Sequence, residues 1–468
     1  MILIRNAKII DGTGAPERHG DVLISGNAIS AIGNFPHKKT EVTIDALGQR
    51  LIPGCISIHP QAGYEATLFT DHAPTTQREG YTTLIGGADG TSIAPLCNGS
   101  LEAFRKWGGT SGINIGWRSM AEFRRAFNYA PRTINFGTFA GYNTVRRAIL
   151  HEMDGDPTDK EQKVIVHILE EAIIEGALGV AINLDTAHGQ GISHEEVRHV
   201  ALLAARYGVP LALKPRAWGK HFMESANEIV ALYRATGARI ILIDFLPREL
   251  NKAEEKDFRQ AYTVIQDAGD GLFMEIQYGP DQHMPIYELL PRFARTGTIH
   301  SMRMLLEDKS QRKKIIANLP RLEGARIIHT PREYKALINV SLEDFAQNRG
   351  VTGKEAILEL MRITQLKATI AIPQKPSALH TELIRDARVL PSGPLQSVYK
   401  AVDDALLPLE TATMKLTGLP ATVLNLTKRG MLSENYAADL VLIDDRATVI
   451  RTIINGSING IKGICVNK

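Results

Sequence analysis

Short apolar runs alternate with longer helical stretches through most of this 468-residue chain. Runs at residues 179–182, 210–213 and 239–243 have the β-branched character of strands, and the segments 195–207 and 226–236 between them have a helical pattern. Repeated strand–helix units favour parallel strands. We therefore predict an α/β fold whose main part is a (β/α)₈ TIM barrel. An open doubly wound sheet is the alternative, and the absence of a Gly-rich phosphate fingerprint after any early strand disfavours it.

Both ends of the chain have a different texture, with short β-rich runs and tight turns. These runs are residues 2–4, 8–10, 22–24, 28–32, 439–444 and 453–456. We therefore predict a small β-sandwich domain formed from both termini, residues 1–52 plus 425–468. The barrel is predicted over residues 53–424, with an insertion around 280–350.

The charge balance limits the kinds of partner. Lys and Arg total 54 against 51 Asp and Glu, for a net charge of +3, which is too balanced to indicate nucleic acid or an anionic membrane. No apolar run is long enough to span a bilayer. Three scattered cysteines, Cys55, Cys97 and Cys465, are typical of a reducing compartment. We predict a cytoplasmic protein that binds a small molecule and not nucleic acid or membrane, with a homo-oligomer left open.

Charged side chains follow several of the apolar runs, at the strand ends where a barrel carries its chemistry. They are His59, Asp89, Lys214, Asp244 and either Asp386 or Arg388. A single residue of this kind is more often a solvated loop charge than a functional group. Opposite charges at successive strand ends, however, would converge on the barrel mouth and require partners there. These residues are therefore the candidate site.

Many segments of the sequence resemble the D-aminoacylase (N-acyl-D-amino-acid deacylase) branch of the amidohydrolase superfamily. They are residues 4–14, 53–59, 80–83, 92–95, 176–179, 236–238, 416–421, 428–430 and 437–441. The resemblance implies a metal-dependent (β/α)₈ barrel with a small β-domain built from both termini. It also implies hydrolysis of the amide bond of N-acyl-D-amino acids by one or two zinc ions that activate water.

The metal-ligand words of that family are altered here. The family has a His-x-His pair, a Cys, two further His and a late Asp. The corresponding positions read His59-Pro60-Gln61, Asp89, Lys214 in Lys214-Pro215-Arg216, Asp244, and Arg388 or Asp386, while a Gly-His word reads Gly141-Tyr142. Zinc requires His, Cys or carboxylate ligands, and neither an ammonium nor a guanidinium can ligate it. The substitutions therefore predict that the zinc site is dismantled, with no metal ligands and no cofactor.

On this interpretation, the positive charges of lysine and arginine side chains take the place of the metal ion and neutralise the carboxylates of the site. We predict a metal-independent enzyme acting on an N-acylated or amino-acid-derived small molecule that bears a carboxylate. Lys214 would be the base or Schiff-base nucleophile, with Asp244 or Asp89 as proton shuttle and His59 as the retained imidazole. The expected reactions are condensation, cyclisation, dehydration or isomerisation rather than hydrolysis. The predicted substrate-binding residues are Arg216, Arg388, Gln61 and Tyr142.

Two alternatives stay open. In the first, the chain is a catalytically dead pseudoenzyme in which Lys214–Asp244 and Arg388–Asp89 pairs hold the barrel shut while it binds a ligand or partner. In the second, it is a zinc-dependent deacylase with relocated ligands. Those ligands would come from His59, His188, His283 or His329, together with Asp89 and Asp244.

Overall fold

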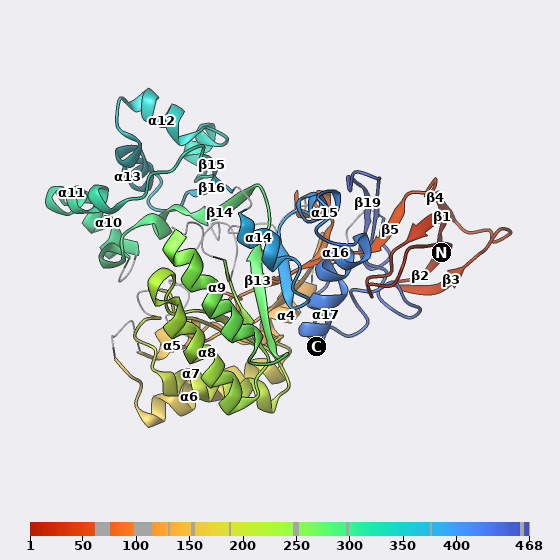
Figure 1. Ribbon diagram of the computed structural model, residues 1–468, viewed down its shortest axis with the longest axis horizontal. Helices are drawn as coiled ribbons and strands as arrows, with labels where there is room; N and C mark the ends of the chain where they lie inside the picture. Colours follow the sequence, from red (N-terminus) through yellow and green to blue (C-terminus); the bar gives the residue numbers. More distant parts are fainter. Residues whose placement is uncertain are drawn as a thin grey trace.

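The computed structural model of the chain describes residues 1–60, 75–97, 115–129, 132–150, 155–186, 189–246, 252–295, 299–374, 377–458 and 463–467. Figure 1 shows the strands of both chain ends on one side of the molecule, the barrel with its helices in the middle, and an inserted α/β unit on the far side.

Parallel strands form the barrel. In hydrogen-bonded order they are β6 (Cys55–Ser57), β7 (Tyr81–Gly86) and β8 (Asn135–Thr138), then β9 (Ala140–Gly141), β10 (Val180–Asn183), β11 (Leu211–Lys214), β12 (Ile240–Leu242), β13 (Leu272–Gln277) and β17 (Val389–Ser392). β8 and β9 follow one another through Phe139 and act as one barrel strand. The prediction of an α/β barrel fold is confirmed.

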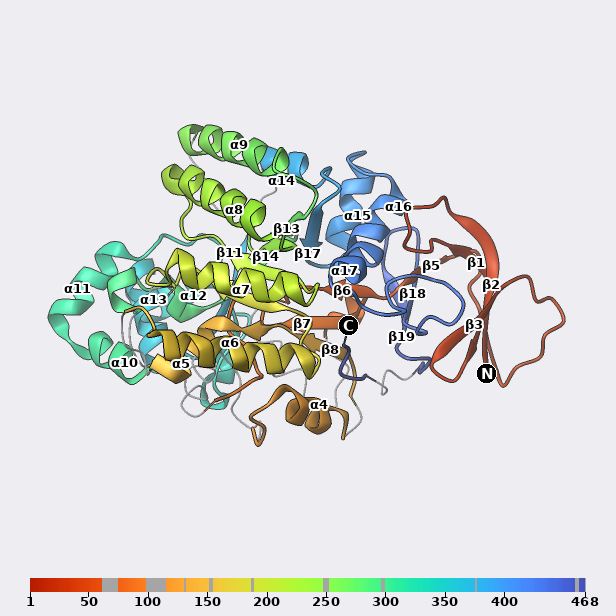
Figure 2. The same cartoon turned by 90° about the horizontal axis from the view of Figure 1, so that it is seen from below.

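Helices cover the outside of these strands. Those of the barrel region are α2 (Thr75–Arg78), α4 (Met120–Asn128), α5 (Tyr142–Leu150), α6 (Asp159–Ile174), α7 (His194–Arg206), α8 (Phe222–Thr236), α9 (Lys252–Gln266), α14 (Ala378–Leu383), α15 (Leu395–Asp403), α16 (Leu409–Leu416) and α17 (Gly418–Val423). Figure 2 shows α6, α7, α8 and α9 side by side along the strands. Among the described helices, none combines the length and apolar character that a membrane span requires.

Side chains alternate between the two faces of each barrel strand, as the period of two requires. Ala212, Ile241 and Leu390 belong to an apolar cluster inside the barrel. Their neighbours Leu211 and Ile240 pack outward against the helices. The interior of the barrel is therefore filled with apolar side chains below the carboxyl ends of the strands. Polar groups can occupy only the layer at those carboxyl ends.

Strands from both chain ends build the small domain. It is a seven-stranded sheet of β1 (Ile2–Ile9), β2 (Arg18–Ser25), β3 (Ala28–Gly33), β4 (Val42–Asp45), β5 (Arg50–Pro53), β18 (Leu440–Ile443) and β19 (Val449–Ile453). β1 pairs with β4 before a bulge at Asn6 and with β5 after it. The layers predicted as a sandwich are therefore joined in one sheet, because β1 takes part in both halves.

An inserted unit lies between β13 and β17. It contains an antiparallel sheet of β14 (Asp281–Pro285), β16 (Thr369–Pro373) and β15 (Arg326–His329), with helices α10 (Ile299–Glu307), α11 (Lys309–Asn318), α12 (Leu342–Arg349) and α13 (Gly353–Ile363). Ile315, Phe345, Leu360 and Ile370 belong to a hydrophobic core of its own. The predicted insertion is thus a folded unit, while the predicted domain limits stay a prediction.

Candidate active site

Polar side chains replace apolar ones where the barrel strands end. Ala212 on β11 faces the inside of the barrel, so Lys214, two residues further on, faces the same way. On β13, Phe273 packs against the inner cluster, which directs Glu275 and Gln277 inward as well. The sequence pattern of apolar runs that end in charge thus produces a polar layer at the mouth.

Asp244 enters this layer through an unusual backbone conformation. Ile243 belongs to the inner cluster, so simple alternation would turn the next side chain outward. The φ of Asp244 is 51°, in the left-handed region that costs a non-glycine residue roughly 1–2 kcal/mol. Its backbone N–H donates to Glu275 Oε2 at 2.9 Å. This hydrogen bond stabilises the turn and brings the Asp244 carboxylate into the mouth.

Three side chains of ligand type meet there. His59 Nδ1 lies 3.3 Å from Glu275 Oε2 and 3.5 Å from Asp244 Oδ1, and one ligand atom from each of the three lies within 4.8 Å of the others. Lys214 Nζ contacts the second oxygen of Asp244, Oδ2, at 2.6 Å. The lysine therefore pairs with one carboxylate oxygen and leaves the other facing His59.

Glu275 is the member of this cluster that the sequence reasoning missed. It is fully buried, and Gln277 Nε2 donates to its Oε1 at 3.1 Å. Its signal in the sequence is a single acidic residue inside the apolar run of β13, Leu272–Gln277. A carboxylate in such a run is rarely buried without a partner, so this position could have been identified as functional.

The charges of the mouth shift one another's titration. Burial opposes the charged form of His59, but the carboxylates of Asp244 and Glu275 outweigh it and raise the pKa of His59 to about 9. Burial likewise opposes the charge of Lys214, yet Asp244, Glu288 and other carboxylates raise its pKa above the usual value. Burial raises the pKa of Asp89, and His59 and Lys214 oppose that change. Carboxylates outnumber cations here, which favours an added positive charge.

This donor set fits a divalent metal ion. Imidazole nitrogen and carboxylate oxygen are zinc ligands, and three protein ligands with an open position are typical of catalytic zinc sites. His59, Asp244 and Glu275 offer these groups. Among the described residues, these three form the group of His, Cys, Asp or Glu side chains close enough together to hold a metal ion. His283 and His329, which were alternative ligand candidates, lie on β14 and β15 of the inserted unit. Gln61 and His188 lie outside the described residues.

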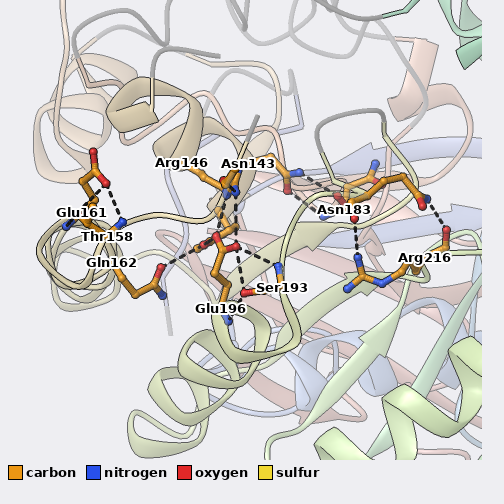
Figure 3. A network of polar contacts seen from close by, with 12 residues as sticks. Asn143, Arg146, Thr158, Glu161, Gln162, Asn183, Ser193, Glu196 and Arg216 are labelled. Carbon is orange, nitrogen blue, oxygen red and sulfur yellow. Dashed lines mark hydrogen bonds and ion pairs between the residues drawn. The ribbon is translucent and has the colours of Figure 1, made fainter. Parts of the chain in front are cut away.

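Arg216 does not present a free guanidinium to a substrate. Its Nε and Nη2 bind both oxygens of Glu228 on α8, at 3.2 and 2.9 Å. Its Nη1 donates to the backbone oxygen of Gln190 at 3.1 Å. Figure 3 shows Arg216 at one side of a wider network of polar contacts, near Asn183. The guanidinium that was predicted to bind a substrate carboxylate is therefore already paired with Glu228 of the protein itself.

Tyr142 is also turned away from the mouth, contrary to the prediction. It is fully buried, and its hydroxyl donates to Glu196 on α7. Glu196 in turn binds Arg146 Nε at 2.7 Å, and Figure 3 shows this pair beside Ser193. Tyr142 is turned away because it is the first residue of α5, where its side chain points toward α7 and not toward the strand ends.

Arg388 and Asp386 lie at the opposite end of the barrel from the mouth. Both precede β17, so they stand at its amino end. Arg388 Nη2 pairs with Asp386 Oδ2 at 3.3 Å, and its Nη1 donates to the backbone of Gly269, ahead of β13. The expected Arg388–Asp89 pair is therefore wrong. The apolar pair 383–384, interpreted as a strand, instead ends α14, and the strand begins at Val389.

The same end of the barrel holds a buried lysine whose titration predicts a pH dependence. Lys415 on α16 is 1% exposed and donates to the backbone oxygens of Val389, at 3.1 Å, and Asp386. Burial lowers the pKa of Lys415 from 10.5 to about 8, although Asp386 opposes the change. Between these values the unfolded chain binds more protons than the folded one, so the free energy of unfolding rises with pH.

We expect the free energy of unfolding of the wild type, relative to that of Lys415→Met, to increase by roughly 3 kcal/mol between pH 8 and 10.5. Urea unfolding of both proteins across this range measures the difference. The exposed Lys367→Met variant is the control and should give no such slope. A constant difference between wild type and Lys415→Met would contradict the prediction.

A parallel (β/α)₈ barrel, a small β-domain drawn from both chain ends and ligand-type side chains at the strand ends together define an amidohydrolase-fold protein. Its homologues and structural neighbours are D-aminoacylases and N-acyl-D-amino-acid deacylases of the amidohydrolase superfamily, as the sequence resemblance predicted.

The chain is 25% identical over 463 residues to a D-aminoacylase of Alcaligenes xylosoxydans xylosoxydans, covering 96% of this chain and 89% of that protein. An N-acyl-D-aspartate deacylase of the same organism is 26% identical over 94% of this chain and 85% of its own length. The structure of N-acyl-D-glutamate deacylase from Bordetella bronchiseptica superposes with a TM-score of 0.79 at 20% identity, covering 100% of this chain and 99% of that one. No protein-family model matches the chain.

These comparisons correct the prediction of a site without metal. The Bordetella structure is a complex with zinc and a phosphonate inhibitor, and a D-aminoacylase with a TM-score of 0.77 has a binuclear metal centre. The present chain offers His59, Asp244 and Glu275 as a group that could hold a metal. The prediction was wrong because it counted only the altered motif positions, and Glu275 lies outside all of them.

Proposed function

We propose that this protein is a metal-dependent deacylase that hydrolyses the amide bond of N-acyl-D-amino acids. The observation that carries the proposal is the convergence of His59, Asp244 and Glu275 at the barrel mouth. The substrate class is supported by the D-aminoacylase and N-acyl-D-aspartate deacylase to which nearly the whole chain is similar.

His59 Nδ1 and one oxygen each of Asp244 and Glu275 would hold the ion. Bound there, it supplies Lewis-acid chemistry, which activates water and polarises the amide carbonyl. Lys214 Nζ binds Asp244 Oδ2 at 2.6 Å and thereby keeps Oδ1 on the side of His59. This role makes Lys214 a positioning residue rather than the nucleophile of the earlier prediction.

The surrounding groups hold the ligands in place, as partners of metal ligands commonly do. Gln277 donates to Glu275 Oε1, so that Oε2 is directed to His59 and to the N–H of Asp244. Asp89 is a further carboxyl of the mouth, and Thr91 N–H donates to its Oδ1 at 3.3 Å. We assign to Asp89 the delivery of a proton from Oδ2 to the departing amine, because burial raises the pKa of Asp89 and so favours the protonated form that can donate.

The experiment combines metal analysis with a substrate panel. We expect protein purified without chelators to carry about one divalent ion per chain and to release the amino acid from N-acetyl-D-amino acids faster than from the L-enantiomers. Removal of the ion should abolish turnover, and zinc should restore it. Protein that binds no divalent ion and remains inactive with zinc across the panel would refute the proposal and favour a ligand-binding role without turnover.

A further inference from the structure

A cavity of about 270 Å³ lies beside the end of β13, outside the cluster of His59, Asp244 and Glu275. Its lining includes Tyr278, His380, Thr381, Ser397, Lys400 and Asp404. Tyr278 directly follows Gln277 in the chain, and α14 and α15 supply most of the other residues. Figure 1 shows α14 next to β13, and α15 on the side of α14 toward the small β-domain. The cavity is slightly smaller than the pockets that hold drug-sized ligands, which begin near 300 Å³.

Several polar side chains around this cavity make no hydrogen bond or ion pair with other described residues. Within the part of the chain that the structure describes, no hydrogen bond involves the side-chain hydroxyls of Tyr278, Thr381 or Ser397, and no ion pair involves Lys400 or Asp404. Tyr278 is only 7% exposed. Burial raises the pKa of Tyr278, and the Asp404 carboxylate adds to this effect. The Tyr278 hydroxyl and Asp404 therefore share one electrostatic environment.

His380 adds a hydrogen-bond donor. The backbone N–H of Ser377 donates to His380 Nδ1 at 3.1 Å, and the Ser377 hydroxyl lies 3.0 Å from the same nitrogen. A ring nitrogen that accepts from a backbone N–H carries no proton, so in the neutral imidazole the proton is on Nε2. Burial also lowers the pKa of His380, which favours this neutral form. The ring packs edge to face against Tyr278 at 6.2 Å between centroids.

The charges of the cavity select the kind of ligand. Lys400 and Asp404 are four residues apart at the end of α15, so they lie on one side of it. They nevertheless do not pair with each other, and each is available to a ligand group of opposite sign. A simple anion would be attracted by Lys400 but repelled by Asp404. A simple cation would be attracted by Asp404 but repelled by Lys400. A molecule that carries both charges satisfies both residues.

We propose that this cavity is a binding site for a free α-amino acid, with the ligand carboxylate at Lys400 and His380 and its ammonium group at Asp404. Tyr278 and Leu406 provide apolar surface for a ligand side chain. The site would thus bind a zwitterion of the class that deacylation releases. It depends on the cavity alone, and not on amide hydrolysis at the mouth.

Calorimetric titration of the full chain with D-leucine and with L-leucine tests the proposal. We expect saturable binding of at least one enantiomer. 4-Methylpentanoate, which lacks the ammonium group, and 3-methylbutylamine, which lacks the carboxylate, should bind at least tenfold more weakly. Lys400→Met and Asp404→Asn should each weaken leucine binding at least tenfold. The exposed substitutions Lys163→Met and Asp267→Asn are the matched controls and should leave it unchanged.

The Glu275→Gln variant separates this site from the mouth, because it should bind leucine as the wild type does even if it is inactive. Loss of leucine binding in Glu275→Gln together with retention in Lys400→Met would place the ligand at the mouth and overturn the proposal. Equal affinity for 4-methylpentanoate would show a carboxylate site instead of a zwitterion site. No binding of either enantiomer at millimolar concentration would also overturn it.

Discussion

Replacing Glu275 with glutamine should lower the metal content from about one ion per chain to less than one tenth and reduce kcat/KM about 1000-fold. The substitution preserves the size of the side chain but removes a carboxylate that faces His59 Nδ1 at 3.3 Å. A bound ion contributes several kcal/mol to transition-state stabilisation, and each 1.4 kcal/mol corresponds to a factor of ten in rate. The hydrogen bond from Asp244 N–H to Glu275 would also weaken, so two ligands are affected together.

Metal analysis by mass spectrometry and steady-state kinetics with an N-acetyl-D-amino acid measure the effect. The control is Glu196→Gln, which also alters a buried carboxylate, but one that pairs with Arg146 away from the mouth. It should lower stability and keep both metal and activity. A Glu275→Gln protein with full metal content and unchanged kcat/KM would show that the ligand assignment is wrong.

Arg146→Met should reduce the free energy of unfolding by about 3–5 kcal/mol, the usual effect of removing one partner of a buried ion pair. Arg146 and Glu196 are 5% and 3% exposed, and Arg146 also donates to the backbone oxygen of Gly155 at 2.6 Å. Without the guanidinium, the buried Glu196 carboxylate keeps its hydrogen bonds from Tyr142 and Ser193 but loses the ion pair with Arg146 that Figure 3 shows.

Urea denaturation gives this free energy. The double variant Arg146→Met/Glu196→Gln should recover part of the loss, because it removes the buried charge as well. Arg198→Met breaks an exposed pair with Glu195 on the same α7 helix and should leave stability unchanged. If Arg146→Met proved as stable as Arg198→Met, the pair would contribute nothing to the fold.

The barrel and the small β-domain could be predicted because both depend on local patterns. β10 and β11 are short apolar runs, and α7 between them begins with a Ser193–Glu196 capping box. Strand ends were enough to nominate His59, Lys214 and Asp244, which the structure brings together. Their proposed roles remain predictions, because a position at a strand end predicts that side chains lie close together but not what each does in a reaction.

The rest of the site depends on contacts between distant segments. Glu275 has no motif around it, and its partner His59 lies two residues beyond the first strand of the barrel. Arg216 is neutralised by Glu228 from the following helix, which no spacing rule anticipates. The sequence also gives little sign that residue 244 adopts a left-handed conformation. Assigning Arg388 to the mouth failed because an apolar pair in a helix was interpreted as a strand.

The inserted unit between β13 and β17 has a consequence for how the barrel is completed. β13 and β17 are hydrogen-bonded neighbours, with Met274 opposite Val389, but the whole insertion separates them in the chain. Closing a disordered loop of that length would carry an entropy cost that grows with its logarithm. Since the insertion has a core of its own, it can fold first and bring its two ends together. The last barrel strand would then join the sheet late, and weakening the insertion's core would slow barrel closure without touching a barrel residue.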